Sequence, residues 1–503
     1  MNLLQKNIAA NFLGSIWQAL IGLVFVPFYI KFIGIESWGL VGFFMTLQAI
    51  FGLLDMGLTS TLNRELARLS VLPQKEQEMR NLVRTLETLY WGIALLVGMT
   101  TVLLSPFLAH HWIKAGELPV QTIKQTLMIM GFAVALQMPV GFYSGGLMGL
   151  QKQVLLNVTN VCVSTLRGGG AVSLLWLVAP TIQIFFLWQI IMTVIHVFLL
   201  ALFLWRQLPL GIESSVFEMQ LLKNTWRFAA GMSGIFMLAT ILTQLDKIIL
   251  SKMLSLEMFG YYILAGLASS VIPILLGSPV FNALFPRFTS LVAVNDNMAL
   301  KLLYHQGSQL MATLALPVAA VLAFFSFDIL LLWTGSVKTA NAASPIVSIL
   351  VIGMALNCLM VMPYALQLSH GWTSIGLRIN TLLIVILVPA IYFMTTRYGA
   401  MGAAAVWVVL NSIYMLIGVP FTHRRLLKGE MSRWFIEDTL PPFGAALLVG
   451  GTGHWLIPSP MPPLTAFISL TVILLTTLMA SALVAPHMRT WILLQLKTRI
   501  MHV

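Results

Sequence analysis

The feature that most constrains this chain is its succession of apolar runs, each about 20 residues long, the length at which a helix spans a bilayer. The runs lack the strict alternation of polar and apolar residues that is typical of barrel strands, so we interpret them as helices. The chain is 59% hydrophobic and only 9% charged, whereas soluble domains carry about 25% charged residues. It lacks the polar residues needed to cover soluble domains, and lipid is therefore its expected solvent.

Hydropathy predicts about fourteen spans and hence an all-α polytopic membrane protein. The expected spans cover residues 11–33, 38–60, 85–109, 126–149, 154–178, 182–205, 227–250, 258–281, 307–326, 342–366, 376–396, 400–421, 439–457 and 464–484. The segment 61–84 carries many charges, and we predict that it extends the second span as an amphipathic helix on the membrane surface.

An internal repeat divides the chain. Residues 31–39 read KFIGIESWG and residues 252–260 read KMLSLEMFG, with Lys, Glu and Gly repeated without a gap. An even number of spans separates the copies, which indicates a parallel repeat of two six-helix lobes, with a cleft between them, and two further helices at the end. We predict an N-lobe at 1–210, a C-lobe at 211–425, and the two extra spans with a cytoplasmic tail at 426–503.

The basic residues predict the orientation. With the N-terminus in the cytoplasm, twenty of the 28 Lys and Arg residues lie in inside segments, six lie outside, and Arg167 and Lys247 lie within spans. This excess on one side supports fourteen spans with both termini in the cytoplasm. It also accounts for most of the net charge of +12 without a nucleic-acid partner.

Ionisable residues inside spans are rare and mark transport pathways or buried partners. Arg167 is the deepest, about 20 Å into its span at about 1.5 Å per residue, and Gly168–Gly170 follow it directly. Glycines permit close approach of a backbone or a ligand. We expect Arg167 either to line the cleft for an anionic substrate or to pair with a carbonyl or helix end within the bundle.

Gln244, Asp246 and Lys247 form a second polar cluster, in the seventh span. Neighbouring residues on a helix point in different directions, so we expect Asp246 and Lys247 to pair poorly with each other and each to need another partner. They form either a charged wall of the cleft or a group that reaches toward the outer interface.

Three further residues are candidates near the inner ends of spans. Asp55 either takes part in transport, pairs with Arg64 or caps a broken helix end. Arg64 and Arg287 either frame the cytoplasmic entrance or serve only as orientation signals.

No phosphate-binding loop, zinc motif or nucleophile motif is present in the sequence, so we predict no enzyme and no cofactor. Transport would then draw on an H⁺ or Na⁺ gradient, the membrane potential or the supply of substrate.

Several passages in order, GIESWGLVGFFMTLQAIFGLLDMGLTSTLNRELARL, GLMGLQKQ, QLDKIILSKMLSLEMFGYYILA and TTRYGAMGAAAVW, resemble the polysaccharide-transporter branch of the multidrug/oligosaccharidyl-lipid/polysaccharide exporter superfamily. The resemblance covers nearly the whole chain and is strongest for O-antigen or repeat-unit flippases of the Wzx-like type.

The resemblance implies two lobes that alternate access and an undecaprenyl-pyrophosphate-linked oligosaccharide as substrate, flipped from the cytoplasmic to the periplasmic leaflet. It implies cationic cavity residues for the pyrophosphate, a need that Arg167 and Lys247 match, and Asp246 matches the acidic position of the family's LDK motif. Membrane lipids are implied partners, and a polysaccharide polymerase and a chain-length regulator are further candidates.

Three alternatives remain open at this point. A drug or cation antiporter of the same superfamily would carry acidic groups deep in the N-lobe and usually has twelve spans. A lipid II flippase would carry more arginines in its cavity. A membrane glycosyltransferase would need a large soluble loop or catalytic carboxylates, and the sequence shows neither.

Overall fold

The computed structural model describes residues 3–211, 213–372 and 374–490, which are almost entirely helical and contain no β-strand. They form two compact units, Met1–Gly260 and Tyr261–Val503. The first unit contains α1 (Leu3–Gly52), η1 (Leu53–Asp55), α2 (Leu58–Leu69), α3 (Glu76–Phe107), η2 (Leu108–Trp112), α4 (Val120–Gly149), α5 (Gln153–Leu177), α6 (Ile182–Gln207), α7 (Met219–Met253) and the start of α8 (Leu256–Ser269). The second contains the rest of α8, η3 (Pro273–Gly277), α9 (Ser278–Ala293), α10 (Asn297–Phe324), α11 (Ser326–Thr334), α12 (Val337–Leu359), α13 (Val361–Ser369), α14 (Ser374–Leu426), α15 (Met431–Arg433), η4 (Trp434–Thr439), α16 (Leu440–Leu456) and α17 (Pro463–Val484).

Two of the longest helices are each divided by a glycine. Gly34 in α1 has φ 79° and ψ 162°, and Gly399 in α14 has φ 58° and ψ −141°. These backbone angles are open to glycine and strained for residues with a Cβ. Each helix therefore consists of two segments that meet at a kink, at the places where the hydropathy predicts two separate spans.

Counted with these kinks, the described part of the chain contains fourteen long helical segments, as many as the predicted spans. Nine of its helical segments are long and apolar enough to cross a membrane, and two of the nine contain the kinks. The long helices α5, α7 and α16 complete the set. The prediction of an all-α polytopic membrane protein is confirmed.

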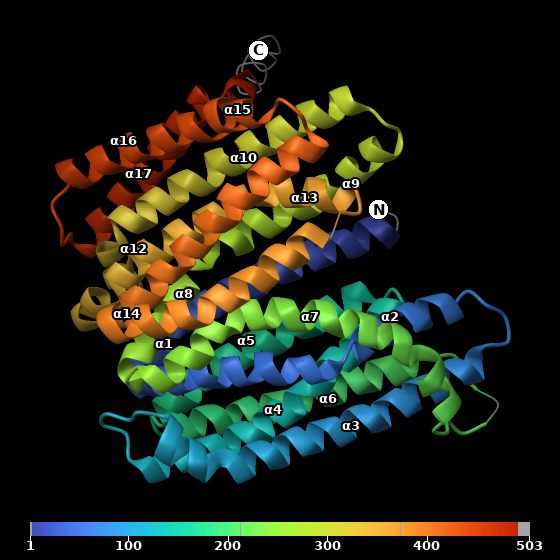
Figure 1. The fold of residues 1–503 in the computed structure, drawn as a ribbon. Helices are drawn as coiled ribbons and strands as arrows, with labels where there is room; N and C mark the ends of the chain where they lie inside the picture. Colours follow the sequence, from blue (N-terminus) through green and yellow to red (C-terminus); the bar gives the residue numbers. More distant parts are fainter. Residues whose placement is uncertain (1–2, 212, 373, 491–503) are drawn as a thin grey trace, which may run out of the picture. The chain divides into compact units, whose positions relative to one another are not determined.

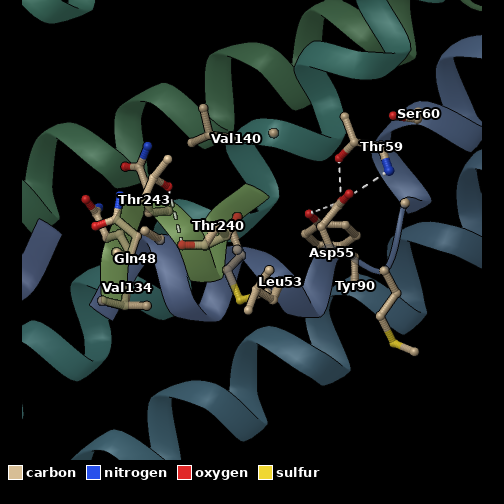
Figure 2. Close-up of a pocket in the computed structure, with 18 residues that line it drawn as sticks. Gln48, Leu53, Asp55, Thr59, Ser60, Tyr90, Val134, Val140, Thr240 and Thr243 are labelled. Atoms are coloured by element: carbon tan, nitrogen blue, oxygen red, sulfur yellow. Dashed lines mark hydrogen bonds between the residues drawn. The ribbon is translucent and has the colours of Figure 1, made fainter. Parts of the chain in front are cut away.

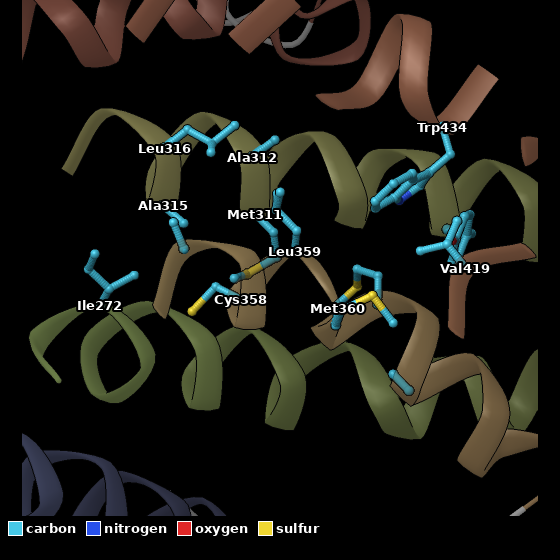
Figure 3. Packing of buried hydrophobic residues seen from close by; sticks show 14 of the residues in the cluster. Ile272, Met311, Ala312, Ala315, Leu316, Cys358, Leu359, Met360, Val419 and Trp434 are labelled. Carbon is cyan, nitrogen blue, oxygen red and sulfur yellow. The ribbon is translucent and has the colours of Figure 1, made fainter. Parts of the chain in front are cut away.

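Each unit has its own apolar core. In the first, α4 packs against α3 and α6, side by side in Figure 1, and their buried residues include Leu86, Phe142 and Leu204. In the second, α10 packs against α12, α16 and α17. Figure 3 shows Met311 of α10 close to Leu359 of α12 in this second core.

The charged segment after the second span differs from the prediction. It is not a continuation of the span, because Met56 (φ 46°) and Gly57 (φ 70°) are left-handed and end it. α2 is a separate helix whose apolar face, including Leu62 and Leu66, is buried against α4. Gly149 of α4 permits this close packing, since a Cβ there would clash with the Asn63 carbonyl oxygen.

The two copies of the repeat pack against each other through their shared glycines. A Cβ at Gly39 would clash with the Leu256 carbonyl oxygen, and one at Gly260 would clash with the Ile35 carbonyl oxygen. Ile35 and Leu256 occupy the same position in the two copies, so the contact is reciprocal. The boundaries of the predicted lobes, 1–210, 211–425 and 426–503, stay a prediction.

Candidate functional site: two polar cavities in the first unit

Arg167 lies in a small, mainly apolar cavity among α1, α4, α5 and α6. The cavity has a volume of about 330 Å³, and we call it the arginine cavity. Its polar lining is otherwise neutral and consists mainly of amides and hydroxyls: Gln18, Tyr29, Gln48, Gln137, Ser164, Gln189 and Thr193. Arg167 is thus a single cation among groups that can donate and accept hydrogen bonds.

Two aromatic side chains hold the segment that carries Arg167. The Phe25 ring packs where a Cβ at Gly168 would be, and the Trp188 ring packs where a Cβ at Gly170 would be. Trp188 Nε1 donates a hydrogen bond of 3.0 Å to the Arg167 carbonyl oxygen, and the Tyr29 hydroxyl donates one of 3.3 Å to the Gly168 carbonyl oxygen. The glycines therefore serve ring packing, which positions the arginine.

The charge of Arg167 is poorly compensated by its surroundings. Its guanidinium donates one hydrogen bond of 3.3 Å to the Thr193 hydroxyl, and its buried Nε has no hydrogen-bond partner. No carboxylate of the described residues forms an ion pair with it. Among these residues, no carbonyl group or helix end accepts a hydrogen bond from the Arg167 side chain, so the alternative of pairing within the bundle gains no support. A partly buried cation without an ion-pair partner is costly within a membrane span, and an anionic ligand would offset that cost.

A second cavity adjoins the first. It has a volume of about 570 Å³, and Gln48 and Gln137 line both cavities. We call it the aspartate cavity, because Asp55 is the one ionisable acid or base among the described residues that line it, apart from the weakly acidic Tyr90. In Figure 2, Asp55 and Thr59 lie at one end of the view, and Gln48 and Thr243 lie at the other.

Asp55 has defined hydrogen-bond partners. Its Oδ1 accepts from the Thr59 backbone N at 3.2 Å, from the Thr59 hydroxyl at 2.6 Å and from the Tyr90 hydroxyl at 2.6 Å. The first of these bonds satisfies an N–H in the first turn of α2, so the prediction that Asp55 caps a broken helix end is confirmed. Asp55 also lines the cavity, so the same side chain can cap the helix and contact a ligand.

The cluster on α7 is only partly associated with this site. Gln244 lines the aspartate cavity, together with Thr240 and Thr243. Asp246 is buried, and Lys247 Nζ lies 3.4 Å from Asp246 Oδ1 and 2.7 Å from the Thr243 carbonyl oxygen. The two neighbours do form an ion pair, but the shorter contact of Lys247 is with the Thr243 carbonyl oxygen, in line with the expectation that each would need another partner. A transport role for Asp246 and Lys247 stays a prediction.

The two arginines predicted at the cytoplasmic entrance lie in different units. Arg64 of α2 is half-exposed and pairs with Glu65, which also accepts a hydrogen bond of 2.8 Å from Arg68. Arg287 is exposed on α9. Their joint role at an entrance stays a prediction.

Apart from Gln244, sequence reasoning missed the neutral polar residues of both cavities. Gln48, Gln137, Thr193 and Tyr90 carry no charge, and single amides and hydroxyls are common in membrane helices. The one sequence signal for these residues is the presence of glutamines within apolar spans, because an amide without a hydrogen-bond partner is costly in hydrocarbon. The described residues contain no group of three or more potential ligands that could hold a metal ion.

The fold is shared with known lipid and drug transporters. The structure of "Lipid II flippase MurJ, inward closed conformation" superposes with a TM-score of 0.70 and 12% identity, covering 95% of this chain and 98% of that chain. An inward-facing multidrug transporter of the MATE family superposes with a TM-score of 0.63 and 14% identity, covering 83% of this chain and 95% of that chain. At these identities the similarity shows the fold alone.

Sequence comparisons identify the family of the chain. A protein of Shigella flexneri named "Putative O-antigen transporter" is 22% identical over 417 residues, which is 82% of this chain and 96% of that protein. The family model described as "Polysaccharide biosynthesis protein" matches residues 4–292, more than half of the chain. The chain is thus a multi-pass membrane protein that belongs to the polysaccharide biosynthesis protein family, as its resemblance to polysaccharide transporters predicted.

Proposed function

We propose that this protein flips undecaprenyl-pyrophosphate-linked oligosaccharide repeat units from the cytoplasmic to the periplasmic leaflet of the inner membrane. The transport would proceed by alternating access and supply the synthesis of a surface polysaccharide such as O-antigen. An H⁺ or Na⁺ gradient is a source of energy that fits the absence of any ATP-binding motif from the sequence.

One observation carries the proposal: Arg167 lies without an ion-pair partner in a mainly apolar cavity whose polar groups are neutral, in a membrane protein from this family. A pyrophosphate is a dense anion with several acceptor oxygens, and a guanidinium binds such groups through parallel hydrogen bonds. The amides and hydroxyls around Arg167 add further donors. A drug antiporter would be expected to offer an acidic group for a cationic substrate at this place. The arginine cavity instead contains a cation.

Complementation in cells tests the proposal. We expect the protein to restore surface polysaccharide in a bacterium that lacks its own repeat-unit flippase but makes a matching lipid-linked precursor. Electrophoresis of the surface polysaccharide is the measurement, and accumulated precursor in the inner leaflet is expected to fall. A bacterium depleted of its lipid II flippase is the matched comparison, because the fold is shared with that class. Rescue of the second strain and not the first would contradict the proposal.

The proposed direction of transport depends on the orientation, which labelling can test. In a cysteine-free background, we expect a membrane-impermeant maleimide added outside to label Lys114→Cys and Lys338→Cys but not Lys75→Cys or Lys428→Cys. All four positions are at least partly exposed in the structure. Labelling of Lys75→Cys and Lys428→Cys, but not of the first pair, in intact cells would show the opposite orientation.

A further inference from the structure

We propose that the aspartate cavity is a sugar subsite that selects an uncharged or amino sugar and rejects an acidic one. This inference rests on the proposed function and names the class of glycan that this chain would carry. It concerns a different cavity from the one that holds Arg167, although the two share Gln48 and Gln137.

The size and chemistry of the cavity suit part of an oligosaccharide. Its volume of about 570 Å³ lies within the range of about 300–1,000 Å³ that is usual for small-ligand sites. Its polar lining combines the amides of Gln48, Gln137 and Gln244 with the hydroxyl of Thr243 and the carboxylate of Asp55. A sugar hydroxyl both donates and accepts a hydrogen bond, and amides and hydroxyls can answer both functions.

Asp55 gives the cavity a negative charge. Its three hydrogen bonds with described residues, two from Thr59 and one from Tyr90, are all accepted by Oδ1. Among the described residues none donates to Oδ2, so this oxygen can accept a hydrogen bond from a ligand. An ionised carboxylate accepts and does not donate, which suits a sugar hydroxyl, an N–H or an ammonium group.

The same charge disfavours an acidic sugar. The described lining of the aspartate cavity contains no lysine or arginine that would offset a second carboxylate. Like charges that are brought together in a site of low dielectric repel each other strongly, and such repulsion is a general source of specificity. Arg167 lies in the adjoining cavity, where it would bind the pyrophosphate. The pair of cavities thus places a cation for the lipid end and an anion for the glycan end.

A residue shared by the two cavities lies a short distance along the chain from Asp55. Gln48 lines both cavities, and Asp55 follows it by seven residues along α1 and η1. That separation corresponds to about 10 Å at about 1.5 Å per residue. A pyrophosphate held at Arg167 would therefore leave the attached sugars to extend past the shared glutamines toward Asp55.

Transport of two matched lipids tests this proposal. The full chain would be reconstituted in phospholipid vesicles with undecaprenyl-pyrophosphate disaccharides that differ at one carbon, with glucose in one and glucuronate in the other. Transfer to the outer leaflet is measured by the accessibility of the glycan to periodate. We expect the wild-type protein to move the neutral lipid at least roughly tenfold faster than the acidic one, because the acidic sugar meets Asp55.

The variant Asp55→Asn is expected to narrow the preference to about threefold or less, mainly through faster transfer of the acidic lipid, because the like-charge repulsion is gone. Its amide oxygen can still accept from Thr59 and Tyr90, so the cap of α2 is retained. Glu117→Gln makes the same change of charge at an exposed position outside both cavities and is expected to leave the preference unchanged. Arg167→Gln is expected to slow the transfer of both lipids.

Three outcomes would overturn the inference. Equal transfer of both lipids by the wild-type protein would remove the selectivity and leave the proposed function intact. If Asp55→Asn left the preference unchanged, or slowed the transfer of both lipids equally, Asp55 would act as a helix cap or in ion coupling and would not select the sugar. Transfer of neither lipid by the wild-type protein would overturn the proposed function as well.

Discussion

An Arg167→Gln variant is expected to lose transport of lipid-linked oligosaccharide by about a hundredfold, because truncating a buried, charged contact of a ligand costs about 2–5 kcal/mol. The melting temperature of the purified protein is expected to stay the same or rise. The folded protein keeps this guanidinium in a cavity with one hydrogen bond and an unpartnered Nε, so removing the charge relieves a cost. Surface polysaccharide in complemented cells and thermal unfolding in detergent measure the two effects.

Two controls separate charge from position. Arg167→Lys keeps the charge but loses the planar group that binds a pyrophosphate through two bonds, and we expect an intermediate loss of about tenfold. Arg206→Gln removes an exposed arginine at the end of α6 and is expected to retain transport. Normal transport in Arg167→Gln would exclude Arg167 from the site, and a large fall in melting temperature would indicate a structural role.

The helices could be predicted from the sequence because each membrane span is determined by the length of a local run of apolar residues. The predicted break between spans at 33 and 38 corresponds to the kink at Gly34, and the break at 396 and 400 corresponds to the kink at Gly399. The separation of α2 from the span before it could not be predicted in the same way. It depends on Met56, a residue that rarely adopts a left-handed conformation, and on the packing of α2 against α4.

The candidate site could be predicted only where a charge stands out in an apolar span. Arg167 and Asp55 were visible for this reason, but their surroundings were not. The glycines after Arg167 suggested access for a ligand, whereas the structure fills that space with the Phe25 and Trp188 rings. Gln48 and Gln137 belong to both cavities, and this follows from the packing of α1 against α4, which no local pattern encodes.

A polar cluster in the other unit joins α10 to η4 and to the turn before α15. The carboxylate of Asp438 lies 2.5 Å from His305 Nδ1 and accepts a hydrogen bond of 2.9 Å from Gln309 Nε2. His305 and Asp438 are fully buried. His305 Nε2 lies 3.2 Å from Glu430, which pairs with Lys301 at 2.9 Å. The hydrogen bond from Lys301 lowers the pKa of Glu430, so this carboxylate is ionised at neutral pH.

An Asp438→Ala variant is expected to destabilise the protein by about 3–5 kcal/mol, because it leaves His305 and the Gln309 amide buried without their acceptor. For a unit of this size, that loss corresponds to a fall of roughly 10 °C in melting temperature. Thermal unfolding of the purified protein, followed by tryptophan fluorescence, is the measurement. The loss is expected to exceed that of any surface charge, since the cluster connects η4 and the backbone N of His487 to α10.

The residue next to Asp438 provides a matched control. Glu437 is also acidic, but it is 45% exposed and pairs with Arg433, which is 43% exposed. Exposed pairs contribute about 0–1 kcal/mol, so Glu437→Ala is expected to change the melting temperature little. Equal effects of the two variants would show that the buried contacts of Asp438 contribute no more than a surface pair. A double variant, His305→Phe with Asp438→Leu, is expected to recover part of the loss, because replacing both buried partners with apolar groups leaves neither one unsatisfied.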